Sequence, residues 1–334
     1  MNKEKTGPGW ADEKREDSYM KYGFGIDVGG TTVKLGLFTD KGELLEKWEI
    51  PTRTANGGEA ILPDIAGAIG DCLNRRGIDK GDVLGLGLGV PGPVSSRGVV
   101  NHCVNLGWGV LDLPRVLGEL TGLKVTAGND ANVAALGECW VGGGRGHDSM
   151  VLATLGTGIG GGIVIDGKII SGAHGAGGEI GHIPMEQNEP EPCGCGKHGC
   201  AEQYGSATGI SRLARRAMER QGTPSALRSL EQVTAKDIFD LGAKGDKLAL
   251  DILEEYYDFM GRFLAGICCV VDPEIIVLGG GVSKAGKPLL EGIRNTFVKY
   301  VFHPGRGIEF ALAQLGNDAG IYGCFKLALD AFSS

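Results

Sequence analysis

The sequence predicts an α/β protein made of two halves with a cleft between them, and three observations support this. Strand-like and helix-like segments alternate along the chain, as is typical of α/β folds. Glycine-rich turns follow strand-like segments in both halves. Sixty of the 334 residues are glycine, without a G-X-Y period, so the chain needs many tight turns and close backbone approaches. Two such halves predict a ligand site at their junction.

The first half begins after a polar tail, residues 1–21, which lacks the apolar core of a secretory signal. The chain contains no apolar run long enough to cross a bilayer, so we expect a cytoplasmic protein that does not associate with membranes. Hydrophobic periodicity in this half predicts two strands, a helix, a buried strand and a short helix, in the order 22–38, 44–50, 58–76, 83–90 and 111–120.

The second half begins where a strand turns into a helix at Asn129 and Asp130, within residues 123–140. A pair of strands joined by glycines is predicted next, followed by a long helix, a further strand and a closing segment, at 149–156 with 161–167, 246–271, 274–282 and 316–332. The sequence shows no internal repeat.

Charge and motif context exclude three common classes. The net charge is −8 and no cluster of Lys and Arg is present, which argues against a nucleic-acid surface. G-x-G-x-x-G occurs at Gly87–Gly92 and Gly156–Gly161, but this glycine content produces such matches by chance, and neither leads from a strand into a helix. A dinucleotide dehydrogenase is therefore not expected. The absence of G-x-x-x-x-G-K-[ST] also argues against a P-loop enzyme.

The stretch "GIDVGGTTVKLGLF" predicts a β-hairpin that could cradle phosphate. Gly29 and Gly30 can adopt φ values that turn main-chain N–H groups inward, and Thr31 and Thr32 can add hydroxyl donors. Asp27 ends the first strand and could hold Mg²⁺ directly or through water. The alternative is an ordinary glycine-rich β-turn.

A cluster of cysteines and histidines lies between Glu179 and Gln203. His182, Cys193, Cys195 and Cys200 offer one imidazole and three thiolates, which is a full tetrahedral set for Zn²⁺. His198 is a spare donor that could replace one of the cysteines. A closed set leaves no position for a reactive water, so a structural zinc is favoured over a hydrolytic one. The glutamates Glu186, Glu189 and Glu191 lie in a proline-containing polar loop and are expected at the surface.

Several motifs occur together in a fixed order: "DVGGTTVK", "GVPGPV", "VNLGW", "GNDANVAALGE", "LGTGIGGGIV", "GEIGH", "CGCGKHGCAEQYGS" and "VLGGGV". In this order they resemble the ROK family, and within it the bacterial glucokinases. The resemblance covers nearly everything after Lys21 and implies the actin-like, ribonuclease-H-like two-domain kinase fold with an interdomain cleft. The implied division is a small domain of residues 22–129 plus 319–334 and a large domain of residues 130–318, with a zinc loop at 182–200.

The resemblance also implies roles for individual residues. Asp130 would be the general base, although aspartate at this place is equally typical of a helix N-cap. The implied sugar-binding residues are Asn105, Asn129, Asp130, Glu179, His182 and Glu202. The implied nucleotide contacts, beyond the hairpin at Asp27, are Thr157, Gly158, Gly279, Gly280 and Gly281. His182 rather than His198 would be the zinc ligand, ATP would bind with Mg²⁺, and the protein would be a homodimer.

The activity implied is phosphorylation of glucose by ATP to give glucose 6-phosphate. Pocket shape decides the acceptor, so kinases for N-acetylmannosamine, N-acetylglucosamine, fructose or allose remain alternatives. The family also contains sugar-responsive repressors, but the twenty or so polar residues before the first strand are too few for a helix-turn-helix unit. A non-catalytic sugar sensor is a further alternative, which ATP turnover with sugar would distinguish.

Overall fold

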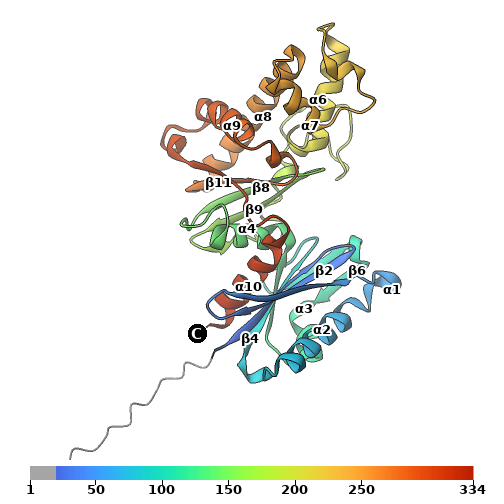
Figure 1. Ribbon diagram of the computed structural model, residues 1–334, viewed down its shortest axis with the longest axis vertical. Coiled ribbons are helices and arrows are strands. Elements are labelled where there is room, and N and C mark those ends of the chain that lie inside the picture. The colour runs from blue at the N-terminus through green and yellow to red at the C-terminus, as the bar shows by residue number, and fades with distance from the viewer. Residues whose placement is uncertain (1–19, 334) are drawn as a thin grey trace, which may run out of the picture.

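The computed structural model describes residues 20–333 and arranges them in two lobes, each built around a five-stranded sheet (Figure 1). The small lobe contains the first sheet, with the strand order β3-β2-β1-β4-β7. β2 is antiparallel to β1 and β3, whereas β4 is parallel to β1 and β7. These strands are β1 (Tyr22–Val28), β2 (Thr32–Thr39), β3 (Leu44–Pro51), β4 (Val83–Val90) and β7 (Val125–Asn129).

The large lobe contains the second sheet, with the order β10-β9-β8-β11-β12. β9 is antiparallel to β8 and β10, and β11 is parallel to β8 and β12, so both sheets have the same topology. The structure therefore repeats a unit that the sequence does not reveal. The strands are β8 (Met150–Leu155), β9 (Ile159–Ile165), β10 (Lys168–Ile169), β11 (Ile275–Gly279) and β12 (Glu309–Leu312). A separate hairpin pairs β5 (Val99–Cys103) with β6 (Trp108–Asp112).

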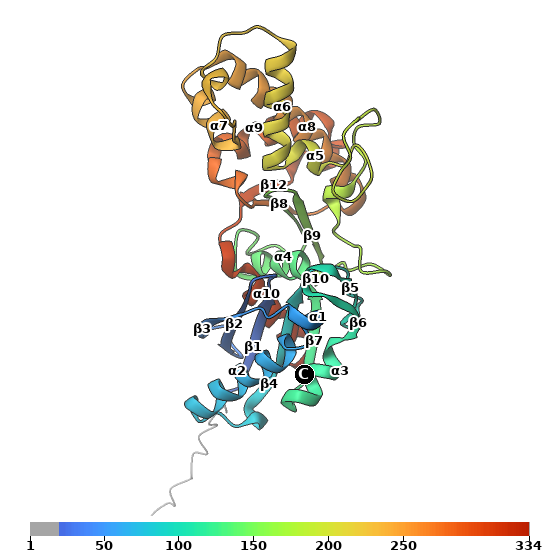
Figure 2. The ribbon, with the colours of Figure 1, turned by 90° about the vertical axis from the view of Figure 1, so that its right-hand side faces the viewer.

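The helices cover the sheets. The small lobe carries α1 (Ala55–Gly58), α2 (Ile61–Arg76) and α3 (Leu113–Thr121). Figure 2 shows the main helices of the large lobe above the second sheet, on the side away from the small lobe. They are α5 (Glu202–Gly205), α6 (Ala207–Arg220), α7 (Ala235–Ala243), α8 (Lys247–Val271) and α9 (Lys287–Tyr300). None of the helices within residues 20–333 is both long and apolar enough to span a bilayer.

Alternating glycines let one face of the first sheet approach a helix very closely. In β4 the leucines Leu86 and Leu88 belong to the core beneath α2 and α3. The glycines between them face α10 (Ala319–Phe332): a Cβ on Gly87 would come within 1.7 Å of the carbonyl oxygen of Cys324. On β1, a Cβ on Gly25 would come within 1.9 Å of the carbonyl oxygen of Ile321. The G-x-G pattern in β4 is thus a packing device and not a nucleotide fingerprint.

Two helices, α10 and α4 (Asp130–Val141), lie between the two sheets (Figure 1). They cross at glycines, because a Cβ on Gly323 would come within 1.6 Å of the carbonyl oxygen of Val133. On its other side α4 meets β9, where a Cβ on Gly162 would lie 2.4 Å from that of Ala135. The order of layers is first sheet, α10, α4, second sheet. We propose the domain division at 129/130 and 318/319, where the chain passes between the lobes.

The predicted elements are present, with some ends shifted. The helix expected from residue 58 begins at Ile61, because Asn56, Gly57 and Gly58 have left-handed backbone conformations. The short helix expected at 111–120 begins at Leu113, where the Asp112 side chain accepts a hydrogen bond from the main-chain N–H of Arg115. The strand-to-helix turn at Asn129 and Asp130 lies where it was predicted.

Candidate active site

A cleft of about 570 Å³ lies between the lobes and brings together several of the predicted residues. Asp27 lines it at the end of β1, and Asn129 and Asp130 line it at the β7–α4 turn. Glu179 lines it from the loop that precedes the candidate metal ligand His182. Other parts of its wall come from both lobes and from the chain crossing before α10: Gly29, Lys34, Thr154, Gly160, Gly316, Asn317 and Gly320. The cleft thus contains three carboxylates contributed by distant parts of the chain.

Burial changes the proton affinity of two of these carboxylates. Burial raises the pKa of Asp27 to about 6; Lys34 opposes this shift and the nearby Asp130 adds to it. The pKa of Asp130 is also raised, mainly by burial and further by the negative charge of Glu179, against a hydrogen bond from the main-chain N–H of Ala131. Carboxylates with raised pKa values in a cleft are typical of groups that accept protons or bind cations.

The structure contradicts one of the two interpretations of the β7–α4 turn, the one in which Asp130 is the helix N-cap. Asn129, not Asp130, is the N-cap of α4: its Oδ1 accepts from the main-chain N–H of Asn132 at 3.1 Å. Its Nδ2 donates to the carbonyl oxygen of Gly92 at 3.1 Å. Asn129 therefore fixes the helix start, and the Asp130 carboxyl is not needed as a cap.

The β1–β2 hairpin forms as predicted, but the reason given for its glycines is wrong. Neither Gly29 nor Gly30 has a positive φ, and the N–H of Gly29 donates to the carbonyl oxygen of Thr32 at 3.0 Å. Thr52 holds the same turn by donating from Oγ1 to the carbonyl oxygen of Gly29 at 2.7 Å. Gly30 and Thr31 are exposed at the tip, so they rather than Gly29 would present donors to a phosphate.

A second hollow of about 480 Å³ adjoins the cleft and shares Thr154 and Gly160 with it. It is lined by Gly158 from the β8–β9 turn, by Glu202 and by Gly280. Gly280 has φ +80°, and a Cβ there would come within 2.6 Å of the Leu155 main chain. The two turns predicted to contact nucleotide, around Thr157 and Gly158 and around Gly279, Gly280 and Gly281, therefore pack against each other.

The ligand atoms of His182, Cys193, Cys195 and Cys200 all lie within 4.8 Å of one another. The sulfurs of Cys195 and Cys200 are 3.6 Å apart, and Nδ1 of His182 is 3.9 Å from the sulfur of Cys193. Tetrahedral zinc with its usual bond lengths needs ligand separations of about 3.5–3.8 Å, so this donor set fits a closed zinc site. His198 is turned elsewhere, with Nδ1 3.0 Å from the carbonyl oxygen of Glu189.

Both predicted sugar-binding glutamates contact this cluster. Nε2 of His182 lies 4.0 Å from Glu179, on the opposite side of the ring from the cysteines. Oε1 of Glu202 lies 2.8 Å from the sulfur of Cys193 and 3.6 Å from Nδ1 of His182. Both carboxylates therefore lie beside the candidate metal ligands.

The sequence profile of the ROK family matches residues 23–331. The chain belongs to the ROK family. A glucokinase of Halalkalibacterium halodurans is 43% identical over 304 residues, which cover 90% of this chain and 92% of that relative. The crystal structure of a ROK hexokinase from Thermus thermophilus matches with a TM-score of 0.76 and 33% identity, over 94% of this chain and 100% of the other. This ROK chain thus has the actin-like two-domain fold.

A ROK glucokinase from Streptomyces griseus, solved in complex with glucose and AMPPNP, matches with a TM-score of 0.68 and 32% identity. The match covers 93% of this chain and 99% of that structure.

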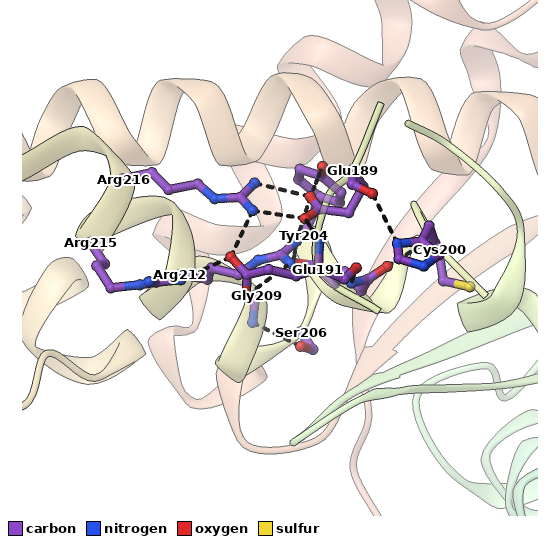
Figure 3. Close-up of polar contacts among 11 residues, drawn as sticks. Glu189, Glu191, Cys200, Tyr204, Ser206, Gly209, Arg212, Arg215 and Arg216 are labelled. Atoms are coloured by element: carbon purple, nitrogen blue, oxygen red, sulfur yellow. Dashed lines mark hydrogen bonds and ion pairs between the residues drawn. The ribbon is translucent and has the colours of Figure 1, made fainter. Parts of the chain in front are cut away.

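In this ROK chain the loop that carries the metal cluster has a second attachment, which the sequence analysis missed (Figure 3). The prediction that Glu189 is a surface residue is wrong, because its side chain is 0% exposed. It accepts from Arg216 at 2.8 and 3.0 Å, pairs with Arg212 at 3.2 Å and contacts the Tyr204 hydroxyl. Hydrogen bonds from Arg216 are the main reason that the pKa of Glu189 falls to about 2. The loop is therefore fixed to α6 by contacts that do not involve the candidate metal ligands.

Two further features were not expected from the sequence: the position of Asn105 and a slot beside Gly281. Asn105 is exposed in a short turn after β5 and is not among the residues that line the cleft. A slot of about 230 Å³, which no motif predicted, lies beside Gly281 between α7 and the turn after β11. Its lining is apolar at Ala235, Phe239, Val282 and Ala285 and charged at Lys236, Asp240 and Lys284.

Proposed function

We propose that this ROK chain is a hexose kinase that transfers the γ-phosphoryl group of ATP to the 6-hydroxyl of glucose. The observation that carries the proposal is the half-buried carboxyl of Asp130, which shares an interlobe cleft with Glu179. This cleft adjoins the hollow between two packed glycine turns. The glucokinase relatives and the structural similarity to a glucokinase with glucose and AMPPNP support the same acceptor and donor.

Asp130 is proposed as the general base. It lines the cleft, its raised pKa makes it a better proton acceptor than an exposed aspartate, and Asn129 fixes the turn that carries it. As the sugar oxygen attacks phosphorus, its proton moves to the Asp130 carboxylate and the bond from the γ-phosphorus to the bridging oxygen breaks. The reaction requires Asp130 to be ionised before the attack.

Asp27 is the residue that would hold Mg²⁺ with ATP. Its carboxyl is buried in the cleft wall, with Lys34 as the neighbouring cation, and this position suits a carboxylate that binds a metal–phosphate complex. The ion would neutralise charge on the β- and γ-phosphates. The hairpin tip at Gly30 and Thr31 and the turns at Gly158 and Gly280 would orient the phosphates. The slot beside Gly281 is proposed to receive the adenine ring, because part of its lining is apolar and it adjoins those turns.

Glu179, Glu202 and His182 are proposed to hold the sugar hydroxyls. With zinc on Nδ1 of His182, the other ring nitrogen is fixed as a donor on the side that faces Glu179. Zinc therefore acts structurally, by ordering the sugar site. Asn105 lies outside the cleft lining, so its proposed contact with the sugar requires the lobes to close.

A panel of hexoses with MgATP tests the proposal. We expect ADP release with glucose and phosphate at the 6-position of the product. A preference for N-acetylmannosamine or N-acetylglucosamine would show that glucose is not the preferred acceptor. If no sugar causes release of ADP, the proposed kinase activity is wrong.

We also propose a cytoplasmic homodimer. Three free cysteines close together at the metal cluster require a reducing compartment to stay available as thiolate ligands. Light scattering on the purified protein would give the mass of the assembly, and a monomer at all concentrations would contradict the dimer.

A further inference from the structure

Glu138, on α4, is a buried carboxyl group outside the cleft. It is 1% exposed, and within residues 20–333 no arginine or lysine forms an ion pair with it. Its partners are three main-chain N–H groups: Gly143 at 2.8 Å, Gln314 at 2.9 Å and Leu315 at 2.8 Å. Three such donors can stabilise a buried carboxylate without a cation.

The glycines after α4 make this arrangement possible. A Cβ on Gly142 would come within 2.1 Å of Oε2 of Glu138, and one on Gly143 within 2.4 Å of the carbonyl oxygen of Leu312. The chain after α4 therefore closes directly over the carboxyl group and against the end of β12. Glu138 thus joins α4 to a segment that is 176 residues away in the sequence.

That segment, residues 313–318, carries the chain from β12 in the large lobe to α10 against the small lobe. Its beginning is held in the large lobe, where the N–H of Ala313 donates to Leu278 at 2.9 Å and Glu138 binds the next two N–H groups. Its end is held by the small lobe: Lys34 donates to the carbonyl oxygen of Asn317 at 3.0 Å, and Lys47 pairs with Asp318 at 2.6 Å.

Gly316 is the one residue between these two anchored ends. It has φ +54°, and the space around its missing Cβ is open. It also lines the cleft. A glycine that connects two fixed points can absorb a change in φ and ψ that its neighbours resist.

We propose that Glu138 is a positioning residue that ties Gln314 and Leu315 to the large lobe, so that closure of the lobes over the sugar bends the chain at Gly316. This inference rests on the proposed function, because it assumes that a bound sugar brings the two lobes together. Asn105 reaches the sugar only if such a movement occurs. Without the Glu138 contact the bend spreads over 314–316, and the closed arrangement of Asp130 and the sugar forms less often.

Glu138→Gln tests the tie directly. The amide keeps the size of the side chain but turns an N–H group towards main-chain N–H donors. We expect faster hydrogen exchange at the amides of Gln314 and Leu315 in the protein without ligand. The matched control is Glu274→Gln, since Glu274 accepts main-chain N–H groups of Asp148 and Ser149 at 2.7 and 2.9 Å within the large lobe. Unchanged exchange in Glu138→Gln would overturn the proposal.

Kinetics separate positioning from mere structural support. In Glu138→Gln we expect kcat/KM for glucose to fall by about 2- to 30-fold relative to Glu274→Gln. KM for ATP should change less than KM for glucose, because the nucleotide turns at Gly158 and Gly280 lie in the same lobe as Glu138. Faster exchange with unchanged glucose kinetics would make Glu138 only structural and would overturn the proposal. If the wild type phosphorylates no hexose, the proposed function fails, while the exchange experiment still decides the tie.

Gly316→Val tests the bend, with Gly77→Val as its control. Gly77 at the end of α2 has φ +64° and equally open space around its missing Cβ, so both valines incur similar backbone strain. We expect turnover to fall by about tenfold in Gly316→Val only. Equal turnover in the two variants would overturn the assignment of Gly316.

Discussion

Asp130 is not needed as the N-cap of α4, because its neighbour Asn129 fills that position. Because Asn129 caps α4, Asp130→Asn should leave the helix start intact and remove only the proton acceptor. We expect turnover to fall by about 10² or more, as for other positioned bases. Glucose affinity measured by calorimetry should stay close to that of the wild type. A variant with near-normal turnover would show that another group takes the proton.

The second prediction at this scale concerns pH and Asp27. Its pKa is about 6 in the folded protein and 3.8 for the ordinary group, so the folded state binds more protons between these values. Asp27 therefore makes the free energy of unfolding fall as pH rises from about 4 to 6. Asp27→Asn should remove this contribution, measured as the wild-type-minus-variant difference in urea unfolding at pH 4 and pH 7. An equal difference at both pH values would contradict the burial argument.

The same shifts set the pH dependence of catalysis. Asp130 must be ionised to accept a proton, and burial raises its pKa, so kcat should rise with pH through a value above 3.8. Because protons compete with Mg²⁺ at Asp27, the concentration of Mg²⁺ needed for half-maximal rate should increase below about pH 6. A pH-independent Mg²⁺ requirement between pH 5 and 7 would argue against Asp27 as its ligand.

At the scale of elements, the loop from His182 to Cys200 is held at two places. Cys195→Ser should remove zinc or weaken its binding, loosen Glu179 and Glu202 and lower glucose affinity. ATP affinity should fall less, because of these two glutamates only Glu202 lines the hollow beside the nucleotide turns. Metal content and both affinities are the measurements. Zinc loss with normal glucose affinity would mean that the attachment of Glu189 to α6 is sufficient. Cobalt in place of zinc should leave turnover nearly unchanged, because it accepts the same tetrahedral ligands.

The sequence predicted helices, strands and residue clusters well where the pattern lies within a short stretch of the chain. The strand-to-helix turn at Asn129 and the four metal ligands are short-range patterns, and the structure brings each set together. Glu189 was mispredicted because its loop has the composition of an exposed turn, whereas its partners Arg212 and Arg216 lie on a later helix. Glu138 gave no signal because its donors at Gln314 and Leu315 are separated from it by most of the large lobe.

At the scale of the whole molecule, the lobes meet where α4 and α10 cross, and a glycine of α10 lies at the point of closest approach. Gly323→Ala would place a Cβ 1.6 Å from the carbonyl oxygen of Val133. The gain in helix propensity, up to about 1 kcal/mol, is smaller than the about 1–3 kcal/mol lost to overpacking. We expect net destabilisation by denaturant unfolding. Gly266→Ala in α8 is the control, because a Cβ there meets nothing within 4 Å, and it should stabilise the protein. Similar effects of the two substitutions would contradict the close crossing.

The position of α10 also affects how the chain is made. The strands of the first sheet are synthesised before the large lobe, but the glycine face of β1 and β4 is covered by α10, which is synthesised after it. The large lobe, which is continuous from α4 to β12, can fold while that face is still open. At ordinary rates of translation the nascent small lobe waits about 10–40 s for its final helix. The small lobe therefore completes its fold only after the large lobe has been synthesised, and termination before α10 would leave its sheet open to aggregation.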